Sequence, residues 1–80
     1  MKSIIIYMPL LNEGTNVCRP VIAHIVGNNV YNIVGTIQGE LPEDLDEEWL
    51  FPVGSNVMCR ISKKDGDEIL IVNKLYSTSL

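Results

Sequence analysis

The sequence predicts an all-β fold in which five antiparallel strands curl into a small barrel. Three observations lead to this prediction. β-Branched and aromatic residues are concentrated in short segments, as they are in strands. Turn-forming residues separate these segments at short intervals. The chain has 80 residues, of which 46% are hydrophobic and 20% are charged, so it is long enough for one core, and we expect a single domain over residues 1–80.

Five segments have the composition of strands. The first, residues 3–8 (SIIIYM), should end at Pro9, which has no backbone N–H to donate to a neighbouring strand. The other four strands are expected at residues 16–26, 30–37, 55–62 and 68–75. The turn sequences Gly27-Asn28-Asn29 and Lys64-Asp65-Gly66-Asp67 favour tight hairpins, because Gly, Asn and Asp tolerate the left-handed backbone that such turns need.

Residues 38–54 break the strand pattern. Asp44 followed by Glu47 has the form of a helix N-terminus, and acidic residues in a first turn suit the helix dipole. Pro52 then limits the length of any helix. We therefore predict one short helical turn at residues 44–49, with a 3₁₀ turn as one form of it.

Closure of five strands into a barrel hides the sheet edges. The loop after the first strand, the two tight hairpins and the helical turn fit a Src-homology-3-like barrel best. In such barrels the helical turn usually precedes the last strand, whereas here it precedes the fourth. An oligonucleotide-binding barrel has its helix between the third and fourth strands, which matches that position better, but those domains are usually longer.

Side chains alternate between the two faces of a strand, and this alternation predicts the core. The inward-facing set is Ile4, Ile6, Val17, Val21, Ala23, Tyr31, Ile33, Val57, Cys59 and Ile61. The last strand is apolar on both faces, and it extends a predicted outer patch made of Ile5, Tyr7, Ile22, Val34 and Met58. We expect either the helical loop with Trp49 or a second subunit to cover this patch.

Arg19 has the alternation of a core residue, although a buried guanidinium without a partner would be very costly. It should therefore lie at the barrel mouth beside a carboxylate, with Glu13 or the acids at residues 46–48 as candidates. The alternative is that Arg19 recognises an anion or a partner protein. A bulge at Pro20 would expose it. The candidate interaction residues are Glu13, Arg19, Glu47, Glu48 and Trp49.

The charge pattern disfavours nucleic acid as a partner. The net charge is −4, and six of the ten carboxylates lie between residues 40 and 48, so the chain repels phosphate backbones. Lys63 and Lys64 stand beside two aspartates, which is typical of a solvated hairpin tip. The apolar run near the N-terminus is read as a strand and not as an export signal, and no segment has the length of a membrane span, so a cytoplasmic protein is expected.

No catalytic set is found. The single histidine, His24, lies about 20 Å from Cys18 along an extended strand, so the two cannot form a dyad within it. Cys18 and Cys59 are read as free thiols, and no zinc, calcium or phosphate-loop spacing is present. We therefore predict that the protein is not an enzyme, and we predict no catalytic, cofactor-binding or metal-binding residue and no cofactor.

Three segments resemble a family of small uncharacterised bacterial proteins: LLNEGTNVCRPVIA (10–23), VYNIVG (30–35) and DEEWLFPVGSNVMCRI (46–61). The matching residues are Glu13, Gly14, Thr15, Val17, Arg19, Pro20, Val21, Ala23, Trp49, Phe51, Pro52, Gly54 and Ser55. This chain departs from the family pattern at Cys18, where the pattern has an aromatic residue, and at Val53, where it has a second proline. The resemblance implies a small all-β protein and carries no activity with it.

These observations together favour a protein-interaction or self-associating module, with a protein partner or a homo-oligomer as the expected assembly. An apolar-rich chain with an acidic loop and no catalytic set supports this reading. The alternative is a nucleic-acid-associated regulator on an oligonucleotide-binding-like barrel that uses Arg19, Arg60 and Lys74.

Overall fold

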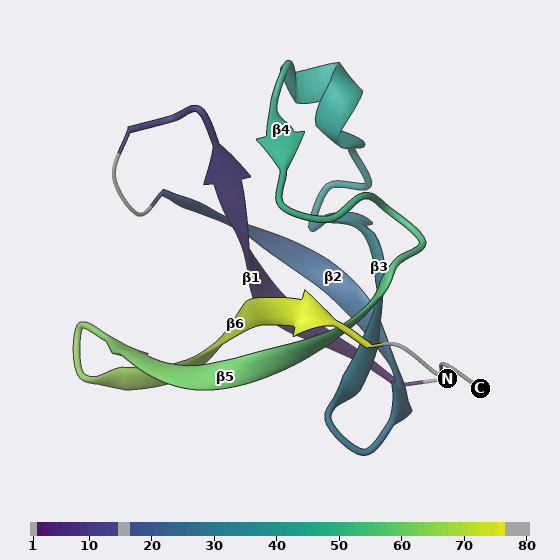
Figure 1. The fold of residues 1–80 in the computed structure, drawn as a ribbon, viewed down its shortest axis with the longest axis vertical. Coiled ribbons are helices and arrows are strands. Elements are labelled where there is room, and N and C mark those ends of the chain that lie inside the picture. The colour runs from purple at the N-terminus through teal and green to yellow at the C-terminus, as the bar shows by residue number, and fades with distance from the viewer. Residues whose placement is uncertain (1, 15–16, 77–80) are drawn as a thin grey trace.

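A computed structural model describes residues 2–14 and 17–76 as one compact all-β domain (Figure 1). Its strands are β1 (Ser3–Leu11), β2 (Cys18–Gly27), β3 (Val30–Thr36), β4 (Glu48–Trp49), β5 (Asn56–Lys64) and β6 (Asp67–Leu75). A single 3₁₀ turn, η1 (Pro42–Leu45), precedes β4. The all-β prediction and the one helical turn are confirmed.

The strands form a six-stranded mixed sheet in which a ring of hydrogen bonds runs through β1, β2, β3, β5 and β6. Within the ring, β2 pairs antiparallel with β1 and β3, and β5 pairs antiparallel with β3 and β6, but β1 and β6 pair in parallel, at Tyr7 and Ile71. The prediction of a wholly antiparallel arrangement is therefore wrong. When five strands alternate in direction, the first and the last point the same way, so closing the ring joins two parallel strands.

The predicted end of the first strand was wrong. Pro9 does not end β1, because it stands in register with Cys18 and its carbonyl oxygen accepts a hydrogen bond from the backbone N–H of Leu50 at 3.0 Å. The strand continues to Leu11, where β4 pairs with it. The short strand β4 adds a sixth strand that the sequence pattern did not indicate.

The helical turn begins two residues before the predicted start. Pro42 takes an early helical position, where its fixed φ is favourable. Asp44 was predicted to be the N-cap, but it lies inside the turn. Its side chain accepts a hydrogen bond from the backbone N–H of Leu41 at 3.0 Å. Asp46 then adopts a left-handed backbone, with φ of 53°, which ends the turn before Glu47.

Both predicted hairpins are confirmed. Asn28 and Asn29 connect β2 to β3, and Asp65 and Gly66 connect β5 to β6. In the second hairpin φ is 52° at Asp65 and 86° at Gly66. Positive φ at both central residues defines the type I′ turn, whose twist matches that of the two strands it joins.

The core lies inside the ring of strands. Some of the residues that were predicted to be in the core are not part of it. The buried hydrophobic residues are Ile6, Met8, Val21, Ala23, Val30, Ile33, Trp49, Val57, Cys59 and Val72. Ile4 and Tyr31 pack against this core in part. Val17 and Ile61, which were predicted to be buried, are 40% and 66% exposed, so they must be removed from the core set.

The predicted outer patch is not covered by the helical loop. Trp49 packs into the core, while Ile5 and Val34 on the outer surface remain exposed. Of the two candidates for covering this patch, the loop with Trp49 does not cover it, and a second subunit stays a prediction. The indole ring is part of the core instead.

The backbone of β3 passes close to the start of the loop that carries η1. A Cβ atom added at Gly35 would lie 2.9 Å from the carbonyl oxygen of Glu40, and that oxygen accepts a hydrogen bond from the backbone N–H of Thr36 at 2.9 Å. We expect Gly35→Ala to lower the free energy of unfolding by about 1–3 kcal/mol, as measured by urea denaturation followed by circular dichroism.

The matched control is Gly27→Ala. Its added Cβ would meet the side chain of Val30 at an ordinary 3.4 Å, and Gly27 lies outside the left-handed region. The loss should stay near or below about 0.5 kcal/mol. Equal losses in the two variants would show that the close approach at Gly35 is not the cause.

Candidate functional site

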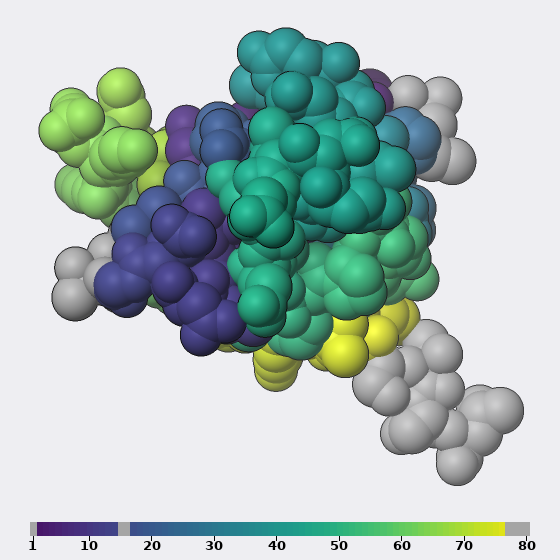
Figure 2. All heavy atoms as spheres, turned by 90° about the horizontal axis from the view of Figure 1, so that it is seen from above, coloured from purple at the N-terminus to yellow at the C-terminus, as the bar shows by residue number. Residues whose placement is uncertain are grey.

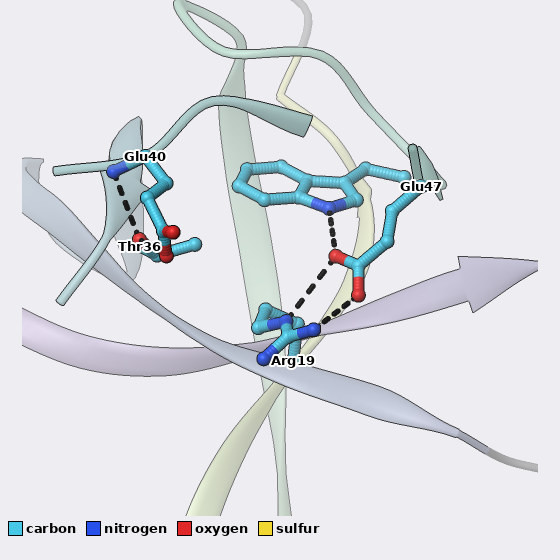
Figure 3. Close-up of polar contacts among 5 residues, drawn as sticks. Arg19, Thr36, Glu40 and Glu47 are labelled. Atoms are coloured by element: carbon cyan, nitrogen blue, oxygen red, sulfur yellow. Dashed lines mark hydrogen bonds and ion pairs between the residues drawn. The ribbon is translucent and has the colours of Figure 1, made fainter. Parts of the chain in front are cut away.

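Arg19 on β2 pairs with Glu47, which lies between η1 and β4 (Figure 3). Arg19 Nε donates to Glu47 Oε1 at 3.2 Å, and Arg19 Nη2 contacts Glu47 Oε2 as an ion pair. Two contacts between a planar guanidinium and a carboxylate fix both groups in orientation. The structure thus selects Glu47 from the candidate carboxylates.

The same carboxylate also binds the indole of Trp49. Trp49 Nε1 donates to Glu47 Oε1 at 3.1 Å, and the Trp49 residue is only 7% exposed. We call Arg19, Glu47 and Trp49 the carboxylate clasp. Because Glu47 accepts from both partners, the clasp connects β2 to the loop before β4 and to the core.

The two charged side chains of the clasp differ in burial, and the hydrogen bond between them shifts the pKa of both. The side chain of Glu47 is 10% exposed, whereas that of Arg19 is 39% exposed. The hydrogen bond from Arg19 holds the pKa of Glu47 below its usual value, with a smaller contribution from Trp49, although burial opposes this shift. The same hydrogen bond raises the pKa of Arg19, so both groups are charged at neutral pH.

A second set of hydrogen bonds fastens the other end of the loop. The backbone N–H of Glu40 donates to the hydroxyl of Thr36 at 2.9 Å, and this hydroxyl donates to Glu40 Oε1 at 3.2 Å (Figure 3). Thr36 is buried. The loop between β3 and β4 is therefore held at both ends, and the clasp serves this architecture.

Three of the five predicted interaction residues meet in the clasp, and two do not. Glu13 is exposed near the end of β1, and Glu48 is exposed on β4. Within residues 2–14 and 17–76, the only ion pair joins Arg19 to Glu47. The predicted set therefore does not form one surface.

A groove lies elsewhere, between the β5–β6 hairpin and the β1–β2 arm, by which we mean the end of β1 from Tyr7 onward and the start of β2 at Cys18. The arm and the hairpin project on the same side of the molecule (Figure 1). Its volume is about 550 Å³. The lining residues are Tyr7, Pro9, Leu10, Val17, Cys18, Arg60, Ser62, Lys63, Lys64, Ile69 and Ile71. Exposure of Val17 follows from this arrangement, because the two arms extend beyond the closed ring.

The groove gathers positive charge in an acidic chain. Arg60, Lys63 and Lys64 are three of the six lysine and arginine residues. None of them has a carboxylate within ion-pair distance in the described part of the chain. Lys64 Nζ lies 5.5 Å from the centroid of the Tyr7 ring, in a cation–π contact.

The groove was missed in the sequence, although one signal pointed to it. Arg60 and Lys64 share one face of β5 by alternation, and their register partners are Ile71 and Asp67 on β6. The second apolar face of β6 is the groove wall. Alternation alone does not predict the groove, because the groove also requires the β5–β6 hairpin to lie across Tyr7.

The groups with chemical reactivity are dispersed. Cys18 is half-buried in the groove and Cys59 is buried in the core, and both are free thiols. Burial raises the pKa of the Cys59 thiol to about 11, so it is protonated and unreactive at neutral pH. His24 lies on β2, where its register partners are Ser3 and Asn32.

Two further properties concern the described residues only. They contain no group of three His, Cys, Asp or Glu side chains placed to hold a metal ion. They also contain no helix that is long and apolar enough to cross a membrane.

Comparisons of the chain with protein-family models, with curated proteins and with solved structures find no match. The resemblance to the small bacterial family therefore stays a prediction. Function has to be inferred from the groove and from the exposed charges.

Proposed function

We propose that this protein is a protein-interaction module whose groove between the β1–β2 arm and the β5–β6 hairpin holds a segment of the partner. The observation that carries this proposal is the combination of an apolar lining with three cations that form no ion pair among the described residues, in a chain of net charge −4. Such a surface fits a partner segment that has apolar and acidic residues.

The size and lining of the groove support a peptide segment as the ligand. Leu10, Val17, Ile69 and Ile71 offer apolar contact, and a volume of about 550 Å³ admits several side chains. The cations at the rim would add electrostatic complementarity, which selects partners and speeds their encounter.

The edge of β6 gives further support. Between Asp67 and Leu70, β6 pairs only with β5, because the strand pairing of β6 with β1 is at Tyr7 and Ile71. A strand with one unpaired edge can accept an extended peptide through main-chain hydrogen bonds. The groove therefore offers both side-chain contacts and a backbone edge.

We also propose that the ring of five strands is a barrel of the Src-homology-3-like type. Its support is the closed order of consecutive strands, the two tight hairpins and the 3₁₀ turn. The position of that turn before β5 still favours the oligonucleotide-binding barrel. Barrel type is an analogy of fold, and it carries no function.

Nucleic-acid binding is the second candidate, and its support is weaker. Arg60 and Tyr7 do face one groove, and a cation beside an aromatic ring can hold a stacked base. Arg19, however, is occupied by Glu47. Lys74, the third predicted contact, does not line the groove.

The thiol of Cys18 provides the test. We expect a short synthetic peptide of alternating Leu and Glu to slow alkylation of Cys18 at least about threefold, by covering the groove. Buried Cys59 serves as an unreactive internal reference. The variant with Lys63→Glu and Lys64→Glu should lose this protection, and a peptide of alternating Leu and Lys should give none.

The outcomes separate the candidates. Protection by single-stranded oligothymidylate, but not by the Leu–Glu peptide, would overturn the proposal in favour of nucleic acid. Protection by neither probe would show that the groove is not a binding site. Protection that survives both lysine substitutions would show that Lys63 and Lys64 do not select the peptide, and would overturn the charge complementarity on which the proposal rests.

A further inference from the structure

We propose that the segment the groove holds is the acidic turn of a second copy of this chain, so that the protein assembles head to tail. This inference rests on the proposed function of the groove and names its occupant. We define the acidic turn as residues 41–48. Its exposed acids are Glu43, Asp44, Asp46 and Glu48.

Charge complementarity is the first argument. The acidic turn has four exposed carboxylates, and the groove has three cations without an ion-pair partner in the described chain. A negative patch that meets a positive patch favours one orientation of two copies over others. Two copies that met through their acidic turns would instead repel each other.

The acidic turn also carries apolar surface, and this is the second argument. Leu41 is 36% exposed, and Leu45 is partly buried. The turn therefore presents apolar surface together with its carboxylates. The lining of the groove has the matching character, since Leu10, Val17, Ile69 and Ile71 lie beside the cations.

The turn is also held in shape before any contact. Asp44 accepts the backbone N–H of Leu41 at 3.0 Å, and the carboxylate clasp holds Glu47. A pre-organised segment loses little conformational entropy when it binds. The clasp thus contributes to association by fixing the ligand.

The contact joins different molecules. The acidic turn and the tip of the β5–β6 hairpin project from different sides of the domain (Figure 1), and the view from above also separates them (Figure 2). The clasp and Thr36 fasten the turn, and within the described residues none of its carboxylates forms an ion pair with a cation of the groove in its own chain. When two copies join through two different patches, one acidic turn and one groove remain free. Further copies can therefore bind, and the assembly extends into chains or closes into rings.

The test uses two charge-reversal variants and sedimentation velocity over a range of concentrations. The groove variant has Lys63→Glu and Lys64→Glu. The turn variant has Glu43→Lys and Glu48→Lys, which leave Asp44, Asp46 and Glu47 in place. We expect the wild type to form oligomers, and each variant alone to associate at least about tenfold more weakly.

Mixing the two variants is the decisive step. The acidic turn of the groove variant faces the unchanged groove of the turn variant, and the reversed turn faces the reversed groove. We therefore expect the mixture to regain assembly, which a misfolded variant could not do. High salt should weaken it, because a Debye length of about 3 Å at 1 M screens these charges.

The remaining outcomes overturn the inference, and they distinguish it from the proposed function. A wild type that stays monomeric, while the Leu–Glu peptide still protects Cys18, refutes self-assembly and leaves the groove as a site for another protein. A monomeric wild type without protection of Cys18 refutes both. Oligomers that neither variant weakens use another surface and refute the inference.

Discussion

Trp49→Ala is expected to lower the free energy of unfolding by about 3–5 kcal/mol. The side chain is almost fully buried in the core, and its removal leaves a cavity and also takes a donor from Glu47. A domain this small often has only about 3–5 kcal/mol of stability from its core. Urea denaturation followed by far-ultraviolet circular dichroism should therefore find the variant largely unfolded.

The control for this variant is Trp49→Phe, which keeps a six-membered aromatic ring in the core but loses the N–H donor and the rest of the five-membered ring of the indole. We expect a smaller loss of about 1–2 kcal/mol, close to that of one hydrogen bond to a charged group. If alanine and phenylalanine cost the same, the packing of the indole ring contributes nothing beyond its hydrogen bond. That result would contradict the role of Trp49 in the core.

Glu47→Ala is expected to cost about 2–3 kcal/mol, because it leaves Arg19 and the buried indole N–H of Trp49 without their acceptor. The loss is below that of a fully buried pair, since Arg19 is partly exposed and water can solvate it. Glu48→Ala is the matched control, because the neighbouring carboxylate is exposed on β4. It should change stability by less than about 0.5 kcal/mol.

The pH dependence of stability gives an independent check on the same clasp. The pKa of Glu47 is lowered in the folded state from an ordinary 4.5, so its contribution is fully present above that value and is lost as pH falls through the lowered pKa. Wild type should exceed Glu47→Gln in stability at neutral pH, and the difference should shrink over the pH range below about 4.5. A constant difference over this range would contradict the assigned ion pair.

Local patterns were sufficient to predict most of the fold. The hairpins at Asn28–Asn29 and Asp65–Gly66 are short-range features, and side-chain alternation correctly placed Ile6, Val21 and Ile33 inside. The rule that proline ends a strand failed at Pro9, because its register partner Cys18 needs no donor from it. β4 has only two residues, so it is too short for an alternation of side chains to be recognised in the sequence.

The sites were harder to predict, because they depend on contacts between distant segments. Alternation showed that Arg19 needed a carboxylate, but the choice among Glu13 and the acids at 46–48 depended on where the loop returns to β1. That return is set by the pairing of Leu10 with Trp49. The groove likewise depends on how the β5–β6 hairpin bends over Tyr7, which no local pattern encodes.

The parallel pairing that closes the ring also bears on the kinetics of the fold. The β2–β3 and β5–β6 hairpins join near neighbours and lose little chain entropy when they form. Tyr7 and Ile71 come from opposite ends of the chain, so we expect their contact to form late, after the transition state. Interactions made that late act mainly on the unfolding rate. Because both residues line the groove, a bound segment should lengthen the lifetime of the native state without making it form faster.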